Sequence, residues 1–279
     1  MTELTYLEAL VLGLVQGLTE FLPVSSSGHL AIAQNLFDLP GSSPQMLLFD
    51  VLSHTGTLLA VAFVFAGTFK AFAARLIAET RPSFGGKRTG WLVAFLAVVA
   101  CVPTAAIGLG FKDKFEASFD SMPTVGIGLL ISGALLFAVG RVPRPRRGWR
   151  RIGWWRAAVV GIAQGAAILP GLSRSGSTIC TAMMLGFKRR WAVEFSFLIV
   201  VPPIVGATLI KLRDTFALPP EQLGDIPWWP LILGSIVALI SGVVALRLLL
   251  ALVIRQKLQH FCWYCWLLGA VILVATFRP

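Results

Sequence analysis

The sequence predicts an all-α polytopic membrane protein, an inverted-topology repeat with two re-entrant helix-loop-helix regions and about six full spans. Three observations predict this fold class. Of the 279 residues, 56% are hydrophobic and only 13% are charged, whereas soluble domains carry roughly 25% charged residues. The apolar segments are long and continuous, which excludes a membrane β-barrel, whose strands alternate over about ten residues. One polar sequence pattern also occurs twice, each time inside an interrupted apolar region.

Six apolar segments are long enough for a spanning helix, which needs about 20 residues. These segments are residues 47–66, 91–111, 123–140, 191–210, 230–254 and 261–277. Two further apolar regions, 7–34 and 157–187, are interrupted by Pro, Gly and Ser. These two interrupted regions also carry most of the polar groups found within apolar sequence. We therefore expect both regions to be broken helices rather than simple spans.

Positive charge is concentrated between the apolar segments. Seventeen of the 24 basic residues lie in four clusters, at 67–90, 141–156, 188–190 and 255–257. The positive-inside rule places such clusters in the cytoplasm. All four fit on one side only if 157–187 enters and leaves the membrane there, which predicts a re-entrant region, with 7–34 as its counterpart from the outside face. The net charge of +11 therefore indicates orientation and not nucleic-acid binding.

The two broken regions resemble each other at an offset of 148 residues: 12–28 reads LGLVQGLTEFLPVSSSG and 160–176 reads VGIAQGAAILPGLSRSG. If one copy enters from outside and the other from inside, the two broken helices meet near the bilayer midplane. We expect a single membrane domain over residues 1–279. Its repeat halves are approximately 1–140 and 157–279, with the basic cytoplasmic linker 141–156 between them.

Chemically versatile side chains gather in both broken regions. The first contributes Gln16, Glu20, Ser25, Ser26, Ser27 and His29, and the second contributes Ser173, Arg174, Ser175 and Thr178. Arg174 is the only Lys or Arg in either region, and a guanidinium suits a phosphate bidentately. Hydroxyls and helix-start N–H groups add donors, while a carboxylate and an imidazole supply nucleophilic or acid–base chemistry. We therefore expect a site for a lipid-borne phosphate.

Several polar residues are compatible with more than one role. Glu20 and Arg174 are also compatible with a structural ion pair that joins the two repeats. Asp50 and His54, four residues apart, form either a second polar pair in the site or a helix–helix contact, which is slightly favoured. Glu194 follows a basic cluster and is expected near the membrane interface or as a helix cap.

At this point two motifs are recognisable. Residues 16–29 (QGLTEFLPVSSSGH) and 170–178 (PGLSRSGST) resemble the two signature motifs of the undecaprenyl-diphosphate phosphatase family, the bacitracin-resistance family. The runs 49–61 (FDVLSHTGTLLAV) and 194–207 (EFSFLIVVPPIVGA) resemble the same family, so the resemblance covers nearly the whole chain. It implies removal of the terminal phosphate from a C55 polyprenyl diphosphate, which recycles the lipid carrier of cell-wall synthesis and confers bacitracin resistance.

The resemblance further implies an interdigitated inverted-repeat fold and a divalent cation, Mg²⁺ or Ca²⁺. It implies a multi-pass protein of the bacterial inner membrane whose active site opens to the periplasmic side. The expected partners are the polyprenyl diphosphate substrate and membrane lipid, without nucleic acid, and a homodimer is left open.

Residue roles follow from the matching motifs. The resemblance implies that Ser26 is the nucleophile, His29 the motif histidine and Arg174 the phosphate-binding arginine. Gln16 and Glu20 match an [E/Q]xxxE pair; a neutral amide offsets little charge, so Glu20 is expected to carry more of the metal binding. Either His29 or Glu20 takes the proton of Ser26, and direct attack by water stays an alternative. The expected substrate-binding residues are Gln16, Ser25, Ser27, Ser173, Ser175 and Thr178.

The competing prediction is a transporter or flippase of an anionic, phosphorylated lipid. Inverted repeats and broken helices favour it too, and Arg174 would serve such a protein equally well. A transporter does not need Glu20 and His29 together beside a serine cluster, which favours the enzyme.

Overall fold

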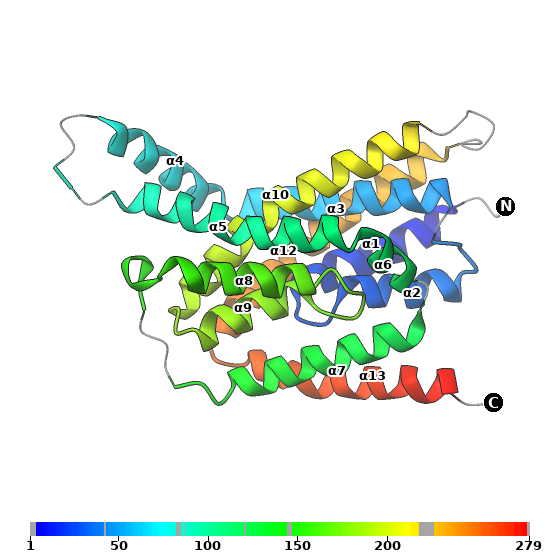
Figure 1. Ribbon diagram of the computed structural model, residues 1–279. Helices are drawn as coiled ribbons and strands as arrows, with labels where there is room; N and C mark the ends of the chain where they lie inside the picture. Colours follow the sequence, from blue (N-terminus) through cyan, green and yellow to red (C-terminus); the bar gives the residue numbers. More distant parts are fainter. Residues whose placement is uncertain are drawn as a thin grey trace.

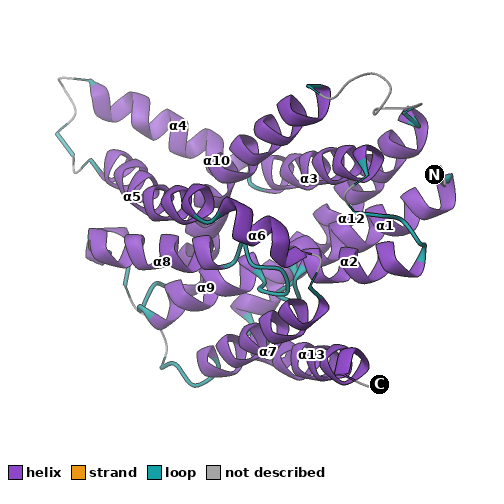
Figure 2. Ribbon diagram, turned by 45° about the vertical axis from the view of Figure 1, so that its right-hand side comes forward, coloured by secondary structure: helices purple, strands orange, loops and turns teal. Residues whose placement is uncertain are grey.

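The computed structural model describes residues 4–41, 43–81, 85–86, 88–119, 121–143, 147–217 and 226–277. Within these residues the regular structure is helical (Figure 2), apart from an isolated bridge between Arg147 and Phe187. The long helices are α3 (Pro44–Val64), α5 (Thr89–Gly110), α7 (Met122–Val139), α10 (Arg189–Phe216), α12 (Trp228–Ile254) and α13 (Phe261–Phe277), which follows the short turn η2 (Leu258–His260).

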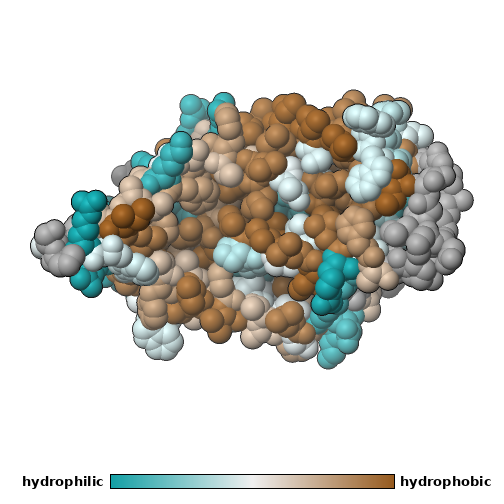
Figure 3. All heavy atoms as spheres, turned by 90° about the horizontal axis from the view of Figure 1, so that it is seen from above, coloured by the Kyte–Doolittle hydropathy of each residue, from teal (hydrophilic) through white to brown (hydrophobic). Residues whose placement is uncertain are grey.

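Six of the described segments are long and apolar enough to cross a membrane: the five helices α3, α5, α7, α10 and α12, and the stretch Leu258–Thr276 that includes most of α13. All six predicted spans are therefore confirmed, although α10 continues to Phe216, beyond the predicted end at residue 210. Seen from above, apolar side chains fill the middle of the molecule and hydrophilic ones collect toward its two ends (Figure 3). The chain is a multi-span membrane protein.

Each interrupted region folds as two short helices joined by a loop. The first region forms α1 (Tyr6–Phe21) and α2 (Ser26–Leu36), and the second forms α8 (Trp154–Ala166) and α9 (Arg174–Met184). Figure 1 shows the two loops turned toward each other near the middle of the molecule. A proline lies in each loop, where it cannot continue the preceding helix. The broken helices are confirmed; their re-entrant course through a bilayer stays a prediction.

Small residues let each broken helix pack tightly on a span of the other half. Gly13 and Gly17 of α1 lie against the backbone of α12, and a side chain at Gly13 would overlap the carbonyl of Gly234. The repeat-equivalent Gly161 and Gly165 of α8 lie against α5, Gly161 against the backbone of Ala100 and Gly165 against the side chain of Ile107. Such close approach is how membrane helices gain van der Waals contact. The helices of the two halves therefore interdigitate.

Two short helices, α4 (Ala66–Thr80) and α6 (Lys112–Phe119), lie in segments that the sequence predicts to be loops. The end of α4 is fixed by Glu79, which is buried and outside the six candidate spans. Its carboxylate accepts hydrogen bonds from the N–H groups of Gly90 (2.8 Å) and Trp91 (3.2 Å) and from Arg75 Nε (2.7 Å). Burial raises the pKa of Glu79, but these bonds lower it more, so the net pKa lies below its ordinary value.

The ends of the molecule differ in charge. The described parts of the connections that carry the four basic clusters lie at one end of the long helices, and both chain termini lie at the other (Figure 1). Glu194 belongs to the basic end, where its carboxylate accepts a hydrogen bond from Arg190 Nε at 2.8 Å. It makes a helix-surface pair and takes no part in the site described below.

Candidate active site

Glu20, in the last turn of α1, lies at the centre of the polar residues; only 5% of its side chain is exposed. Its Oε2 accepts hydrogen bonds from Ser26 Oγ at 2.6 Å and from Gln16 Nε2 at 3.1 Å. Its Oε1 pairs with the guanidinium of Arg174. A buried carboxylate without such partners would cost several kcal/mol. The ion pair between the repeats that the sequence suggested is thus present. The same Glu20 carboxylate also contacts the Ser26 hydroxyl, so it lies between that hydroxyl and the Arg174 guanidinium.

Ser26 and Arg174 are placed by equivalent helix starts. Each is the first residue of its short helix, and the preceding residue caps that helix. Ser25 Oγ accepts from the Gly28 N–H at 3.4 Å, and Ser173 Oγ accepts from the Gly176 N–H at 3.1 Å. A serine before a helix start satisfies an otherwise unpaired N–H. The repeated Ser-x-Ser-Gly pattern therefore sets where the hydroxyl and the guanidinium begin.

The second loop is held against α7. Ser132 Oγ of α7 accepts from the Ser173 N–H at 2.9 Å and donates to the Gly171 carbonyl at 3.2 Å. Gly171 has φ +84°, and a side chain there would overlap the carbonyl of Val125. Only glycine tolerates both conditions without strain. This loop is therefore rigidly positioned beside Arg174.

The remaining predicted hydroxyls form matching pairs in the two repeats. Ser25 Oγ lies 3.3 Å from Ser27 Oγ, and Ser173 Oγ lies 3.3 Å from Ser175 Oγ. Thr178 Oγ1 donates back to the α9 backbone at 2.9 Å. Ser175 and Thr178 line the pocket described below, whereas Ser25 and Ser173 serve as caps. The structure thus brings both serine groups to one place but gives their members different local tasks.

His29 has two hydrogen-bond partners, the Ser25 carbonyl and the Tyr264 hydroxyl. Its Nδ1 lies 2.8 Å from the Ser25 carbonyl, which can only accept, so Nδ1 carries the hydrogen. Its Nε2, 2.6 Å from the Tyr264 hydroxyl, then accepts from that group. Within the described residues no hydrogen bond joins His29 to Ser26 or Glu20. The sequence offers no signal for Tyr264, an aromatic residue in an apolar span.

His54 and Asp50 extend the polar group along α3. His54 Nε2 lies 3.8 Å from Glu20 Oε2, and His54 Nδ1 is bonded to the Asp50 carbonyl at 2.8 Å. Asp50 Oδ2 lies 3.6 Å from Lys211 Nζ of α10. His54 therefore belongs to the site, while the Asp50 carboxylate makes the helix–helix contact.

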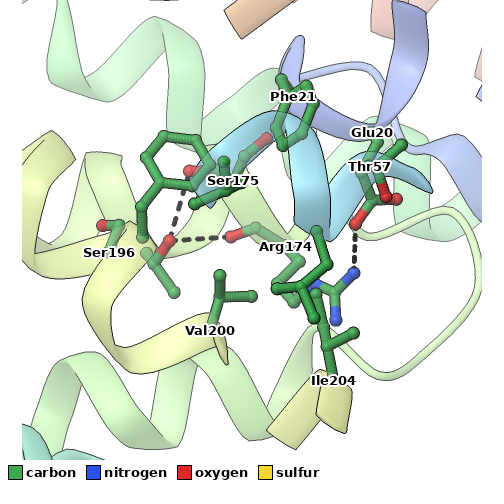
Figure 4. Close-up of a pocket in the computed structure, with 12 residues that line it drawn as sticks. Glu20, Phe21, Thr57, Arg174, Ser175, Ser196, Val200 and Ile204 are labelled. Carbon is green, nitrogen blue, oxygen red and sulfur yellow. Dashed lines mark hydrogen bonds and ion pairs between the residues drawn. The ribbon is translucent and has the colours of Figure 1, made fainter. Parts of the chain in front are cut away.

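A small pocket lies between α1, α3, α9 and α10 (Figure 4). Its polar lining is Glu20, Thr57, Arg174, Ser175, Thr178 and Ser196, and its apolar lining is Phe21, Leu58, Val61, Phe197, Val200 and Ile204. Figure 4 shows the Glu20–Arg174 pair on one side of the pocket, with Val200 and Ile204 beside it. The pocket thus combines a charged end with an apolar wall, which suits a phosphate attached to a hydrocarbon chain.

The donor set limits how a divalent cation could bind. The described residues contain no cluster of three or more His, Cys, Asp or Glu side chains that could hold a metal. Beside Glu20, the buried Gln16 Oε1 has no hydrogen-bond partner among these residues. One carboxylate and one amide oxygen fit a cation that takes its other ligands from phosphate oxygens and water. They do not make a protein cage.

Comparisons with known proteins show which family the chain is similar to. The family model for "Bacitracin resistance protein BacA" matches residues 9–271. The undecaprenyl-diphosphatase of Alkaliphilus metalliredigens is 39% identical over 276 residues, covering 97% of this chain and 98% of that protein. The undecaprenyl-diphosphatases of Syntrophotalea carbinolica (42% over 268 residues; 96% and 98%) and Carboxydothermus hydrogenoformans (41% over 267 residues; 96% and 96%) are similar over the same extent.

Proposed function

The chain belongs to the BacA family of bacitracin resistance proteins, and on that premise we propose that it hydrolyses undecaprenyl diphosphate to undecaprenyl phosphate and inorganic phosphate. It is a membrane-embedded phosphatase that returns the lipid carrier to cell-wall synthesis and confers bacitracin resistance. The observation that carries the site assignment is the single carboxylate of Glu20, bonded to the Ser26 hydroxyl and to the Arg174 guanidinium. A nucleophile, a base and a phosphate clamp are thereby in contact.

The chemistry starts with phosphate binding. Arg174 exchanges its contact with Glu20 for the diphosphate, whose charge it matches bidentately. Ser26 Oγ then attacks the terminal phosphorus while its proton passes to Glu20 Oε2, 2.6 Å away. The bond from phosphorus to the bridging oxygen breaks, and undecaprenyl phosphate leaves with that oxygen. Water then attacks the phosphoserine, Glu20 returns its proton to Ser26 Oγ as the bond from phosphorus to Ser26 breaks, and orthophosphate leaves with the protons of the water.

The pocket lining supports a lipid substrate. Leu58, Val61, Val200 and Ile204 offer an apolar surface next to the charged pair. A prenyl chain on that surface keeps its contacts with hydrocarbon while the headgroup reaches Arg174.

We further propose a divalent cation, Mg²⁺ or Ca²⁺, held by Glu20 and Gln16 Oε1 together with the phosphate oxygens. When bound, the cation offsets negative charge on the diphosphate and on the leaving phosphate. Every proton transfer above is assigned to residues of the chain, and none requires the cation.

We also propose that the protein lies in the bacterial inner membrane with its site open to the periplasm. The four basic clusters at one end of the molecule support a cytoplasmic position for that end. The chemistry needs one chain; a homodimer stays a prediction that the mass of the purified protein in detergent would test.

The test uses undecaprenyl diphosphate labelled in its terminal phosphate and purified protein in detergent. We expect chelator-sensitive release of labelled phosphate, and acid quenching during turnover should leave label on the protein. Ser26→Ala should lose both signals, while Ser118→Ala, in α6 and away from the site, should keep them. Full activity in Ser26→Ala would assign the attack to water. No release, combined with lipid movement in proteoliposomes, would favour the transporter.

A further inference from the structure

The proposed hydrolysis creates a transport problem that the pocket alone does not solve. Orthophosphate is a small dianion formed beside Glu20, whose side chain is 5% exposed. Through the apolar wall of Leu58, Val61 and Ile204 it would have to shed its water without receiving polar contacts. The released phosphate therefore needs a polar route to the aqueous phase, and this requirement rests on the proposed function.

A row of polar side chains leads away from Glu20 along α3 to α10. His54 Nε2 lies 3.8 Å from Glu20 Oε2, and His54 sits one helical turn after Asp50. Asp50 Oδ2 in turn lies 3.6 Å from Lys211 Nζ, which comes from α10. The side chains of His54, Asp50 and Lys211 are 29%, 23% and 47% exposed. The row thus begins at the buried Glu20 and ends at the half-exposed Lys211, with His54 and Asp50 at intermediate exposure.

The direction of this row is set by the two helices. From the pocket residue Thr57, the chain of α3 runs back through His54 and Asp50 to its start at Pro44. From the pocket residue Ile204, α10 runs on through Lys211 to Phe216. Both of these helix ends lie at the end of the molecule that holds the chain termini, opposite the basic clusters (Figure 1). The row therefore points to the side proposed as periplasmic.

The ion pair between Asp50 and Lys211 is loosely held. Asp50 Oδ1 is buried and has no hydrogen-bond partner among the described residues. Its other oxygen meets Lys211 at 3.6 Å, longer than a charge-assisted hydrogen bond of about 2.8 Å. A buried acceptor that lacks a donor costs free energy. Such a cost is expected where the surroundings of a carboxylate must leave room for water and a passing anion. Lys211 can leave Asp50 at little cost when a phosphate arrives.

We propose that His54, Asp50 and Lys211 line the exit of orthophosphate, and that Lys211 receives the anion from the active site by exchanging the Asp50 carboxylate for it. Asp50 then recovers Lys211 and displaces the phosphate into water by charge repulsion. In this role Lys211 acts after the phosphate has left the lipid. It is a residue of product release, separate from the groups that bind and cleave the diphosphate.

The test compares phosphate formed with phosphate released in Lys211→Met, using a quenched-flow assay beside a fluorescent phosphate sensor. We expect kcat to fall about tenfold with kcat/KM unchanged, because release follows the first irreversible step. Acid-quenched samples should then show a burst of about one phosphate per enzyme that the sensor does not see. Lys211→Arg should restore the wild-type time course, since it keeps the positive charge.

A matched control separates release from helix packing. Lys112→Met removes another half-exposed lysine, whose side chain is 48% exposed and whose Nζ lies 3.9 Å from Asp214 Oδ2. It should show neither the burst nor the loss of kcat. Equal losses of kcat and kcat/KM in Lys211→Met, or the absence of a burst, would overturn the exit proposal while wild-type hydrolysis still stands. If the wild-type protein releases no phosphate, the proposed function itself fails.

Discussion

The Glu20–Arg174 pair allows a direct comparison between removing one buried charge and removing both. Arg174→Met leaves Glu20 as a carboxylate with 5% side-chain exposure and no cation on Oε1. Glu20→Gln with Arg174→Met removes both charges and keeps similar side-chain volumes. The single variant should be unstable and the double variant stable, although both lose the phosphate clamp and should be inactive.

The loss of stability expected for Arg174→Met depends on the groups that still contact the Glu20 carboxylate. Breaking a buried pair by removing one partner costs about 3–5 kcal/mol. Because Ser26 and Gln16 still donate to Glu20 and the Arg174 side chain is 27% exposed, we expect the lower value, about 3 kcal/mol. This corresponds to roughly a hundredfold larger unfolding constant. The double variant should lie within about 1 kcal/mol of wild type, since neutral replacement of a buried pair is often harmless.

The assay is reversible unfolding in mixed detergent micelles, read by tryptophan fluorescence, together with phosphate release. Arg190→Met is the control, because it breaks an exposed pair with Glu194, 74% exposed at the arginine, and should cost at most about 1 kcal/mol. If the double variant is as unstable as Arg174→Met, guanidinium packing and not the uncompensated carboxylate holds the repeats together. Normal hydrolysis by Arg174→Met would refute the site assignment.

Three further predictions concern the loops and the donor set. Gly171→Ala should destabilise the protein by about 1–3 kcal/mol in the same unfolding assay, because it forces an L residue to φ +84°. The pKa of Glu79 is lowered by folding, so its contribution to stability is complete above its unfolded pKa, about 4.3, and is lost as the pH falls through the lower folded value. Hydrogen exchange of the Gly90 amide should therefore accelerate, relative to its intrinsic rate, below that pH, and Glu79→Gln should abolish the dependence. Gln16→Glu adds a second carboxylate beside Glu20 and should lower, severalfold, the Mg²⁺ concentration that gives half-maximal phosphate release; an unchanged titration would place the cation elsewhere.

The spans could be predicted because length and apolar character suffice to identify them. The segment 47–66, for example, agrees with α3 at Pro44–Val64 because hydrocarbon thickness fixes the number of residues. The helices α4 and α6 could not be predicted in this way, because short segments rich in charged residues have the composition of loops. Glu79, near the end of α4, is an example of information that the sequence pattern does not contain. Its partners are the backbone N–H groups of Gly90 and Trp91, and only folding brings them to its carboxylate.

For the site, residue chemistry was predictable and partner choice was not. The sequence places Glu20, Ser26 and Arg174 together as a phosphate site, and they are in contact. It does not reveal that His29 is paired with Tyr264, which comes 235 residues later on α13. Nor does it distinguish which of the two histidines meets Glu20, because that depends on how α3 packs beside α1. Of the two proton acceptors that the sequence left open, His29 and Glu20, only Glu20 has a hydrogen bond to Ser26 among the described residues, which is why the proposed mechanism uses it.

The repeat explains why these contacts form where they do. Residues 26 and 174 occupy equivalent positions at the offset of 148, and their side chains reach the two oxygens of one carboxylate. Residues related by a pseudo-two-fold axis can share a partner only if it lies close to that axis. The carboxylate has no counterpart, because the position equivalent to Glu20 is Ile168. Symmetry thus brings two helix starts together, and the departures from symmetry at two equivalent pairs of positions, 26/174 and 20/168, give them a hydroxyl, a guanidinium and a carboxylate. In the proposed mechanism, the phosphate that Arg174 binds is therefore attacked by a residue of the other repeat, Ser26.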